Sequence, residues 1–271
     1  MKNAILLITL CFALFSSAQA QQDPQNRPHI LKSEFQTILD SLGVKGSLLI
    51  FDAERERFYS NDFDWANEGF IPASTFKIAN GIIAVETGVV TDESVIFKWD
   101  GQKRALANWE QDLSFKQAFQ FSCVPCFQEV ARTVGEERMK RYLSDFGYGQ
   151  IRFESSEIDS FWLRGESRIS QFEQIDFLVR FYFGKLGVSE RTTSIMKRVM
   201  LIEENQGQKL SGKTGLGRMD DTDIGWIVGY QEIGDKVYFF ATNIQPKDAT
   251  TTDFNAKRLI ATKLALEGMN R

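Results

Sequence analysis

Strand-like runs lie at both ends of this chain, and the long segment between them has helical patterning. Near the N-terminus, residues 46–52 form an apolar run typical of a buried strand, and residues 57–60 follow as a hairpin partner. Three more strands are predicted near the C-terminus, over 208–217, 224–232 and 236–244. This arrangement predicts an α/β fold of the α+β type, with one antiparallel sheet built from both chain ends and flanked by helices.

Helices are predicted at four places along the chain. They cover residues 30–42, 74–87, most of 115–186 and 253–268, and glycines close the first two. The sheet part is therefore expected over about 21–73 and 187–271, with a central, mostly helical part over about 74–186.

The first twenty residues are typical of a cleaved secretory signal. Lys2 precedes an apolar run from Ala4 to Phe15, and the small-residue sequence Ala18-Gln19-Ala20 follows. We therefore expect export to the periplasm, with a mature protein over residues 21–271 that has no membrane span.

The charge balance narrows the range of partners. The formal net charge is −4, or about −5 once Lys2 is removed with the signal. No basic block or stripe occurs, so nucleic acid is not an expected partner. A monomer or a homodimer is compatible with the sequence.

Ser74 and Lys77 are the strongest candidates for catalysis. The only histidine is His29, far from this pair in the sequence, so a Ser-His-Asp triad is excluded. A serine nucleophile still needs a base, and a lysine three positions later on a helix shares the face of Ser74. A helix that begins at Ser74 also leaves its backbone N–H free to stabilise an oxyanion.

Two further motifs strengthen this interpretation by their order. Ser122-Cys123-Val124 comes next, and Lys213-Thr214-Gly215 then ends a predicted strand with a cation, a hydroxyl and an accessible backbone. Penicillin-recognising acyl-transfer enzymes have the same order of serine, lysine, second serine and Lys-Thr-Gly. A second Ser-x-x-Lys, Ser194 to Lys197, lacks the preceding break and the following apolar helix, so we interpret it as structural or surface.

Cys123 and Cys126 are spaced as in a thiol oxidoreductase motif. Such a motif belongs directly after a strand, whereas residues 113–121 have helical apolar spacing. The favoured interpretation is two small, half-buried thiols beside a helix start. A local disulfide is the alternative, because an exported chain enters an oxidising compartment.

From about Phe70 onward the chain resembles the class D (oxacillinase-type) serine β-lactamases. The resemblance rests on Pro72-Ala-Ser-Thr-Phe-Lys77, Phe97-Lys-Trp-Asp-Gly101, Ser122-Cys-Val124, Phe161-Trp-Leu163, Ile169-Ser170, Lys213-Thr-Gly215 and Gly225-Trp-Ile-Val-Gly229. One departure is Gln150, which follows Tyr148-Gly149 where the family has asparagine. The resemblance implies a β-lactamase/transpeptidase-like fold and hydrolysis of β-lactam antibiotics through a serine acyl-enzyme.

The resemblance also implies the catalytic roles. Ser74 would attack the lactam carbonyl, and Lys77, carboxylated by CO₂, would act as the general base. Ser122 would relay a proton to the leaving nitrogen. The backbone N–H groups of Ser74 and Leu216 would form the oxyanion hole.

Binding residues follow from the same resemblance. The substrate carboxylate would be held by Lys213, Thr214, Gly215 and Arg258. Reaction with CO₂ requires a neutral amine, which an apolar enclosure favours by lowering the pKa of Lys77. The candidate walls of this carbamate pocket are Phe76, Val124, Phe127, Trp162 and Leu163. The Trp162 indole N–H is a candidate donor to the carbamate, and neither a metal nor another cofactor is expected.

Three alternatives remain at this stage. A β-lactam sensor or a penicillin-binding transpeptidase would be acylated at Ser74 without turnover. A thiol oxidoreductase would act through Cys123 and Cys126 instead. A non-catalytic periplasmic binding module would keep its function when Ser74 is replaced.

Overall fold

A computed structural model describes residues 27–248, 251 and 253–269 of the chain. The predicted signal, residues 1–20, lies outside these ranges, so its cleavage stays a prediction. In the described part, no helix combines the length and the apolar character that crossing a bilayer requires.

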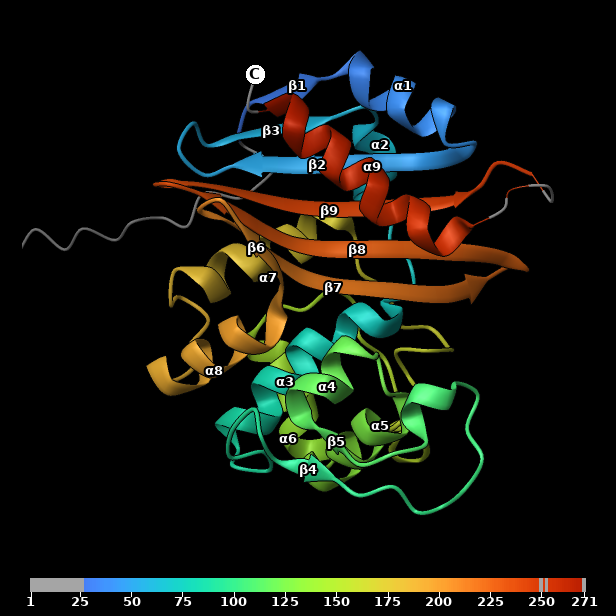
Figure 1. The fold of residues 1–271 in the computed structure, drawn as a ribbon, viewed down its shortest axis with the longest axis vertical. Helices are drawn as coiled ribbons and strands as arrows, with labels where there is room; N and C mark the ends of the chain where they lie inside the picture. The colour runs from blue at the N-terminus through green and yellow to red at the C-terminus, as the bar shows by residue number, and fades with distance from the viewer. Residues whose placement is uncertain (1–26, 249–250, 252, 270–271) are drawn as a thin grey trace, which may run out of the picture.

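Both chain ends contribute to one sheet, which has seven strands within the described residues (Figure 1). The strands are β1 (His29–Leu31), β2 (Val44–Asp52), β3 (Arg57–Ser60), β6 (Leu201–Asn205), β7 (Gln208–Met219), β8 (Thr222–Ile233) and β9 (Lys236–Pro246). They lie in the order β1-β3-β2-β9-β8-β7-β6, and each neighbouring pair is antiparallel except β1 with β3. The predicted α+β sheet built from both ends is confirmed, because β2 pairs with β9 along its whole length.

Helices cover both faces of this sheet (Figure 1). α1 (Ser33–Ser41) and α9 (Phe254–Met269) pack on one face, and α7 (Gln171–Tyr182) packs on the other. The alternation of strand side chains explains the two layers. Leu48 and Ile50 join the core under α1 and α9, whereas Leu49 and Phe51 join the larger core on the opposite face.

The helical part lies beside β7 (Figure 1). Its elements are α3 (Lys77–Glu86), α4 (Phe115–Gln120), α5 (Val124–Val134), α6 (Glu136–Asp145), α8 (Glu190–Met200) and the hairpin β4 (Ile96–Phe97) with β5 (Leu113–Ser114). Short helices complete the described fold: α2 (Phe63–Asn67), η2 (Ala73–Phe76), η3 (Ala107–Trp109) and η4 (Ser155–Glu157). Because α7 packs on the sheet and α8 packs on α3, the chain crosses between the two parts more than once.

One predicted helix boundary is wrong, one short strand lies within a run expected to be helical, and another strand was missed. The helix expected from Ile30 begins at Ser33, because residues 29–31 pair with β3 as a strand. α4 begins at Phe115 as predicted, and residues 113–114, which belong to the run with helical apolar spacing, form β5 instead. β6 was not predicted at all, since its charged and half-exposed residues lack an apolar strand pattern.

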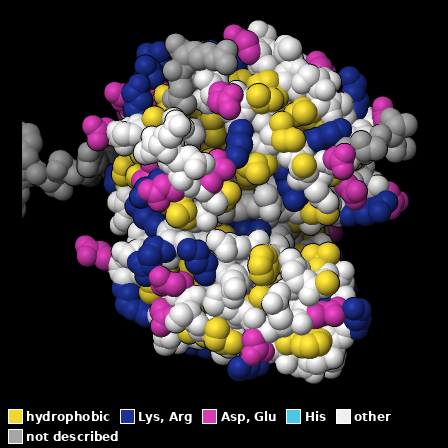
Figure 2. Space-filling view, viewed as in Figure 1, with side chains coloured by type: hydrophobic (Ala, Val, Ile, Leu, Met, Phe, Trp, Pro, Cys, Tyr) yellow, Lys and Arg dark blue, Asp and Glu magenta, His cyan; other side chains and the backbone are white. Residues whose placement is uncertain are grey.

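The surface carries no large field of one sign on the face drawn in Figure 2. Basic and acidic side chains are interspersed there among polar and apolar groups. This mixture is what a solvated protein surface requires, and it agrees with the charge analysis of the sequence.

Candidate active site

Ser74 lies in a tight turn directly before α3. The prediction that an α-helix begins at Ser74 is wrong in detail, because residues 73–76 form the 3₁₀ turn η2 and α3 begins at Lys77. Ala73 has a φ of +50°, a left-handed conformation that costs a non-glycine residue about 1–3 kcal/mol. Packing holds this turn: a Cβ on Gly217 of β7 would lie 3.2 Å from the Cβ of Ala73.

The Ser74 hydroxyl and the Lys77 amine form a buried pair. Lys77 Nζ donates to Ser74 Oγ at 2.9 Å, and Lys77 is fully buried while Ser74 is 8% exposed. Burial, and secondarily the positive charge of Lys213, lowers the pKa of Lys77 well below its ordinary value. The lowered pKa favours the neutral amine, whose lone pair can accept a proton or react with an electrophile.

Aromatic side chains enclose this pair. The ring of Phe127 lies 5.4 Å from Lys77 Nζ. Trp162 stacks on Phe76 with ring centroids 5.0 Å apart, and all three rings are buried. Val124 and Leu163, also predicted as walls, are only half-buried and exclude less water.

Several buried polar atoms have no hydrogen-bond partner among the described residues, and two of them belong to a wall residue and to α3. They are the indole nitrogen of Trp162 and Oδ1 of Asn80, one helical turn after Lys77. The Asn80 side chain is fixed, because its Nδ2 donates to the Phe127 carbonyl at 3.1 Å. Sequence analysis missed Asn80, although its i+3 spacing from Lys77 places both on one helix face. Since an unpaired buried polar group costs about 1–3 kcal/mol, each of these atoms is available to a further group bound beside it.

The open edge of β7 faces the nucleophile turn. β6 pairs with β7 only as far as Ser211, so the strand from Gly212 onward lacks a neighbour on that side and contacts η2 instead. At Gly215 an added Cβ would lie 3.1 Å from Thr75 Cγ2 and 3.2 Å from Trp226 Cβ. A side chain at Gly215 would therefore be tightly packed against the turn, whereas the expected approach of a ligand to this glycine stays a prediction.

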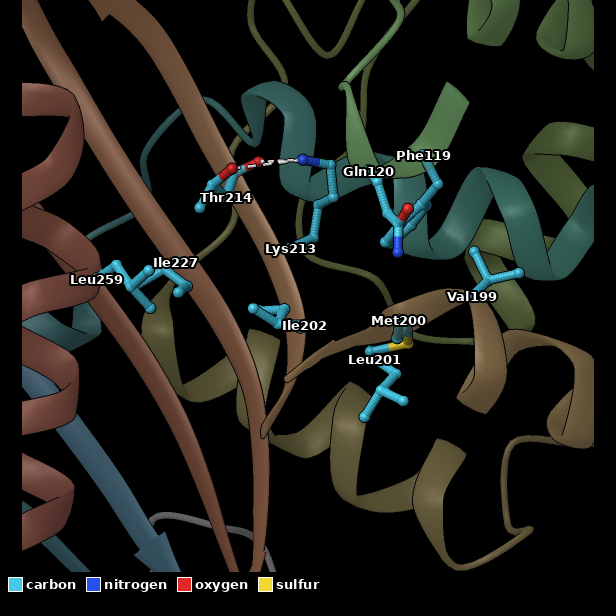
Figure 3. Close-up of a pocket in the computed structure, with 11 residues that line it drawn as sticks. Phe119, Gln120, Val199, Met200, Leu201, Ile202, Lys213, Thr214, Ile227 and Leu259 are labelled. Carbon is cyan, nitrogen blue, oxygen red and sulfur yellow. Dashed lines mark hydrogen bonds between the residues drawn. The ribbon is translucent and has the colours of Figure 1, made fainter. Parts of the chain in front are cut away.

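Two cations lie along this edge. Lys213 is 4% exposed, and its Nζ donates to the Thr214 carbonyl at 3.1 Å (Figure 3). Burial, and then the charge of Arg258, lowers the pKa of Lys213 to about 7. Arg258 of α9 donates to the Gly215 carbonyl at 2.5 Å, and burial lowers its pKa to about 10. Arg258 Nε is buried without a partner among the described residues.

Ser122 lies in the turn between α4 and α5, half-buried and with a φ of +57°. The aromatic residues on either side of this turn contact both lysines. The ring of Phe119 lies 5.7 Å from Lys213 Nζ, and Phe127 lies under Lys77. Leu216 directly follows Gly215 on β7 and is 43% exposed. The Lys-Thr-Gly strand thus contacts the Ser74 turn directly, and the residues flanking Ser122 lie beside the lysines of both other motifs.

Two other sequence features lie outside this group. Ser194 is exposed on α8, and Lys197 lies over the ring of Tyr182 at 3.8 Å, so the second Ser-x-x-Lys does not form a serine–lysine pair like that of Ser74 and Lys77. Gln150 is exposed, and its backbone pairs with that of Arg168.

Cys123 and Cys126 are joined by a disulfide. The favoured interpretation of two free thiols is wrong, and the alternative is confirmed. The geometry explains this, since a three-residue separation at the first turn of α5 places both sulfurs on one side of the helix.

The chain belongs to the penicillin binding protein transpeptidase domain family, whose profile matches residues 21–265. Within that family it belongs to the class D β-lactamases. It is 43% identical over 223 residues to β-lactamase OXA-48 from Klebsiella pneumoniae, which covers 82% of this chain and 83% of that protein.

Solved structures agree with this assignment. The class D β-lactamase YbXI from Nostoc is 39% identical, with a TM-score of 0.83 over 87% of this chain and 98% of that one. The C-terminal domain of the Bacillus licheniformis BlaR penicillin receptor is 26% identical, with a TM-score of 0.83 over 90% and 97% of the two chains. The fold is therefore shared by hydrolases and by a receptor domain.

Proposed function

We propose that this chain hydrolyses β-lactams through an acyl-enzyme formed on Ser74. The observation that carries this proposal is the buried Lys77 amine, held 2.9 Å from the Ser74 hydroxyl in a chain of the class D β-lactamase family. A serine becomes nucleophilic when an adjacent base removes its proton, and a desolvated lysine supplies that base without a histidine.

In the proposed acylation step, Ser74 Oγ attacks the lactam carbonyl while its proton passes to the base at Lys77. The N–H groups of Ser74 and Leu216 stabilise the oxyanion; losing one such donor typically costs about 3 kcal/mol. Ser122 delivers a proton to the lactam nitrogen as the C–N bond breaks. Hydrolysis then releases the acyl group and regenerates the Ser74 hydroxyl.

We also propose that Lys77 is carboxylated by CO₂. The buried amine has a lowered pKa, which makes its neutral, reactive form accessible. The unpartnered Trp162 N–H is a donor suited to a carbamate oxygen. When present, the carbamate supplies a carboxylate-like general base for both acylation and deacylation.

The substrate carboxylate is proposed to bind at the β7 edge. Lys213 and Arg258 supply positive charge there, and Thr214 supplies a hydroxyl. Both cations are largely desolvated, which strengthens their attraction for an anion. An arriving carboxylate would also offset the mutual repulsion of the two cations.

A pH profile tests the role of Lys213. Because its pKa is about 7, the cation is lost above that pH, and kcat/KM for a penicillin should fall about tenfold per pH unit on the alkaline side. Lys77 should determine the acidic side of the profile. Its neutral form is lost as the pH falls, so kcat/KM should also fall there. Replacing Arg258 with methionine should shift the alkaline fall in kcat/KM to higher pH, because removing a neighbouring positive charge raises the pKa of Lys213. An alkaline fall that stays at the same pH would contradict the proposed role of the Lys213 cation.

Export to the periplasm is part of the proposal, since residues 1–20 have the charge, apolar run and small residues of a cleaved signal. The mature protein would then act on β-lactams before they reach the cell wall machinery. A monomer or homodimer stays a prediction.

A penicillin sensor is the second candidate, favoured by the similarity to the BlaR receptor domain. Nitrocefin turnover separates the two functions. A hydrolase converts many equivalents of nitrocefin per protein molecule. A sensor releases one equivalent and leaves a stable acyl adduct on Ser74, which intact-mass measurement detects; that outcome would overturn the hydrolase proposal.

A further inference from the structure

Ser122 has a backbone conformation that needs support from its surroundings. A φ of +57° is sparsely populated for a residue with a Cβ. The turn is tied by two backbone bonds, from Ser122 N–H to the Phe119 carbonyl at 3.1 Å and from Cys123 N–H to the Ala118 carbonyl at 2.8 Å. The residue after Ser122 is also cross-linked covalently, through the Cys123–Cys126 disulfide.

We propose that this disulfide is a redox-sensitive modification site that positions Ser122, so that its reduction selectively slows acylation by β-lactams. The inference rests on the proposed function, because it assigns Ser122 the delivery of a proton to the lactam nitrogen. Cys123 and Cys126 are positioning residues in this scheme, since they act through Ser122.

The disulfide borders a cavity separate from the Ser74–Lys77 pair. This cavity of about 290 Å³ is lined by the 97–111 segment and by α5, and both sulfur-bearing residues contribute to it. Cys126 is 8% exposed, whereas Cys123 is 1% exposed. Cys126 is therefore the more accessible of the two residues to a small dithiol that enters this cavity.

The exchange reaction balances with a dithiol as reductant. One thiolate of the reductant attacks Cys126 Sγ, the protein S–S bond breaks, and its electron pair passes to Cys123 as a thiolate. The second thiolate of the reductant then displaces Cys126, and the reductant leaves as a cyclic disulfide. The protein gains two electrons and takes two protons from water.

The released Cys123 is well placed as the leaving group. It is the N-cap of α5, an eleven-residue helix, and its sulfur accepts the Cys126 N–H at 3.3 Å. Helix N-termini stabilise thiolates. Attack at Cys126, with release of Cys123 as the thiolate, is therefore the favoured direction of exchange.

The consequence should be specific to one catalytic step. Without the cross-link, the Ser122 turn can relax to a negative φ and withdraw its hydroxyl from the leaving nitrogen. Phe127 and Asn80 stay in place, because the helices α5 and α3 hold them through their own backbone bonds. Lys77, and with it deacylation, should be unaffected.

The test compares oxidised and reduced protein in single-turnover experiments with a penicillin. The protein is reduced with dithiothreitol, freed of reductant under nitrogen, and checked by alkylation for two additional thiols. We expect the acylation rate constant to fall about ten- to a hundredfold, the range in which misplacement of a catalytic group acts. The deacylation rate constant should be unchanged, and reoxidation should restore acylation.

The Cys126→Ala variant is the matched control. It lacks the cross-link but keeps Cys123, so it should acylate slowly and show no response to dithiothreitol. An unchanged acylation rate in reduced protein would overturn the proposal, and so would equal losses in both steps or resistance of the native disulfide to reduction. If oxidised protein is not acylated at all, the proposed function itself fails.

Discussion

Replacing Lys77 with alanine should reduce β-lactam turnover by about 10²- to 10⁴-fold, the usual contribution of a general base. The variant loses the titratable group that donates to the Ser74 hydroxyl at 2.9 Å. Residual acylation is expected, because the variant retains the residues proposed for the oxyanion hole and the carboxylate site. Deacylation needs the base to activate water, so acyl-enzyme should accumulate and be detected by intact mass.

Lys197→Ala is the matched control for this variant. Lys197 is the lysine of the second Ser-x-x-Lys sequence, and it lies over Tyr182 rather than beside a nucleophile. Its loss should leave kcat and KM unchanged. Full turnover by the Lys77→Ala variant, or an equal loss in the Lys197→Ala variant, would contradict the assignment of Lys77 as the base.

The parts of the site that sequence analysis located depend on local spacing. Ser74 and Lys77 meet because they are three residues apart in a helical turn. β7, β8 and β9 were predicted because each carries an apolar run bounded by turn residues. The order of the motifs along the chain predicted that Lys-Thr-Gly lies near the nucleophile. In the structure, β7, which carries this motif, contacts η2, which carries Ser74.

The missed features depend on tertiary context. The left-handed φ of Ala73 occurs where Gly217 packs against the turn, and no local sequence pattern reveals that contact. Gln171 is fully buried on α7, where its side chain amide donates to the Ser47 carbonyl at 3.0 Å, a contact across 124 residues of sequence. Composition alone cannot distinguish such a buried amide from an exposed one.

Replacing Trp162 with phenylalanine should make activity strongly dependent on bicarbonate. The variant keeps an aromatic ring against Phe76, and it loses the buried, unpartnered indole N–H together with part of the buried ring. A hydrogen bond to a charged group contributes about 1.5–3 kcal/mol, so the carbamate equilibrium should weaken about ten- to a hundredfold. Activity at ambient CO₂ should fall accordingly and recover on adding bicarbonate by mass action.

The measurement is kcat as a function of bicarbonate concentration at several pH values, with ¹³C NMR of labelled bicarbonate to observe the carbamate directly. The loss of activity in the Trp162→Phe variant should be larger at lower pH, because protonation of Lys77 removes the neutral amine that reacts with CO₂. The lowered pKa of Lys77 means that this protonation occurs only at a lower pH than for an ordinary lysine. Trp65→Phe is the control: its indole N–H donates to Asn243 at 2.9 Å on the sheet side, so its loss should affect stability and not the bicarbonate response. Activity that is indifferent to bicarbonate in both the natural chain and the Trp162→Phe variant would mean that Lys77 acts as a free amine, and the orphaned indole N–H would then need a different partner.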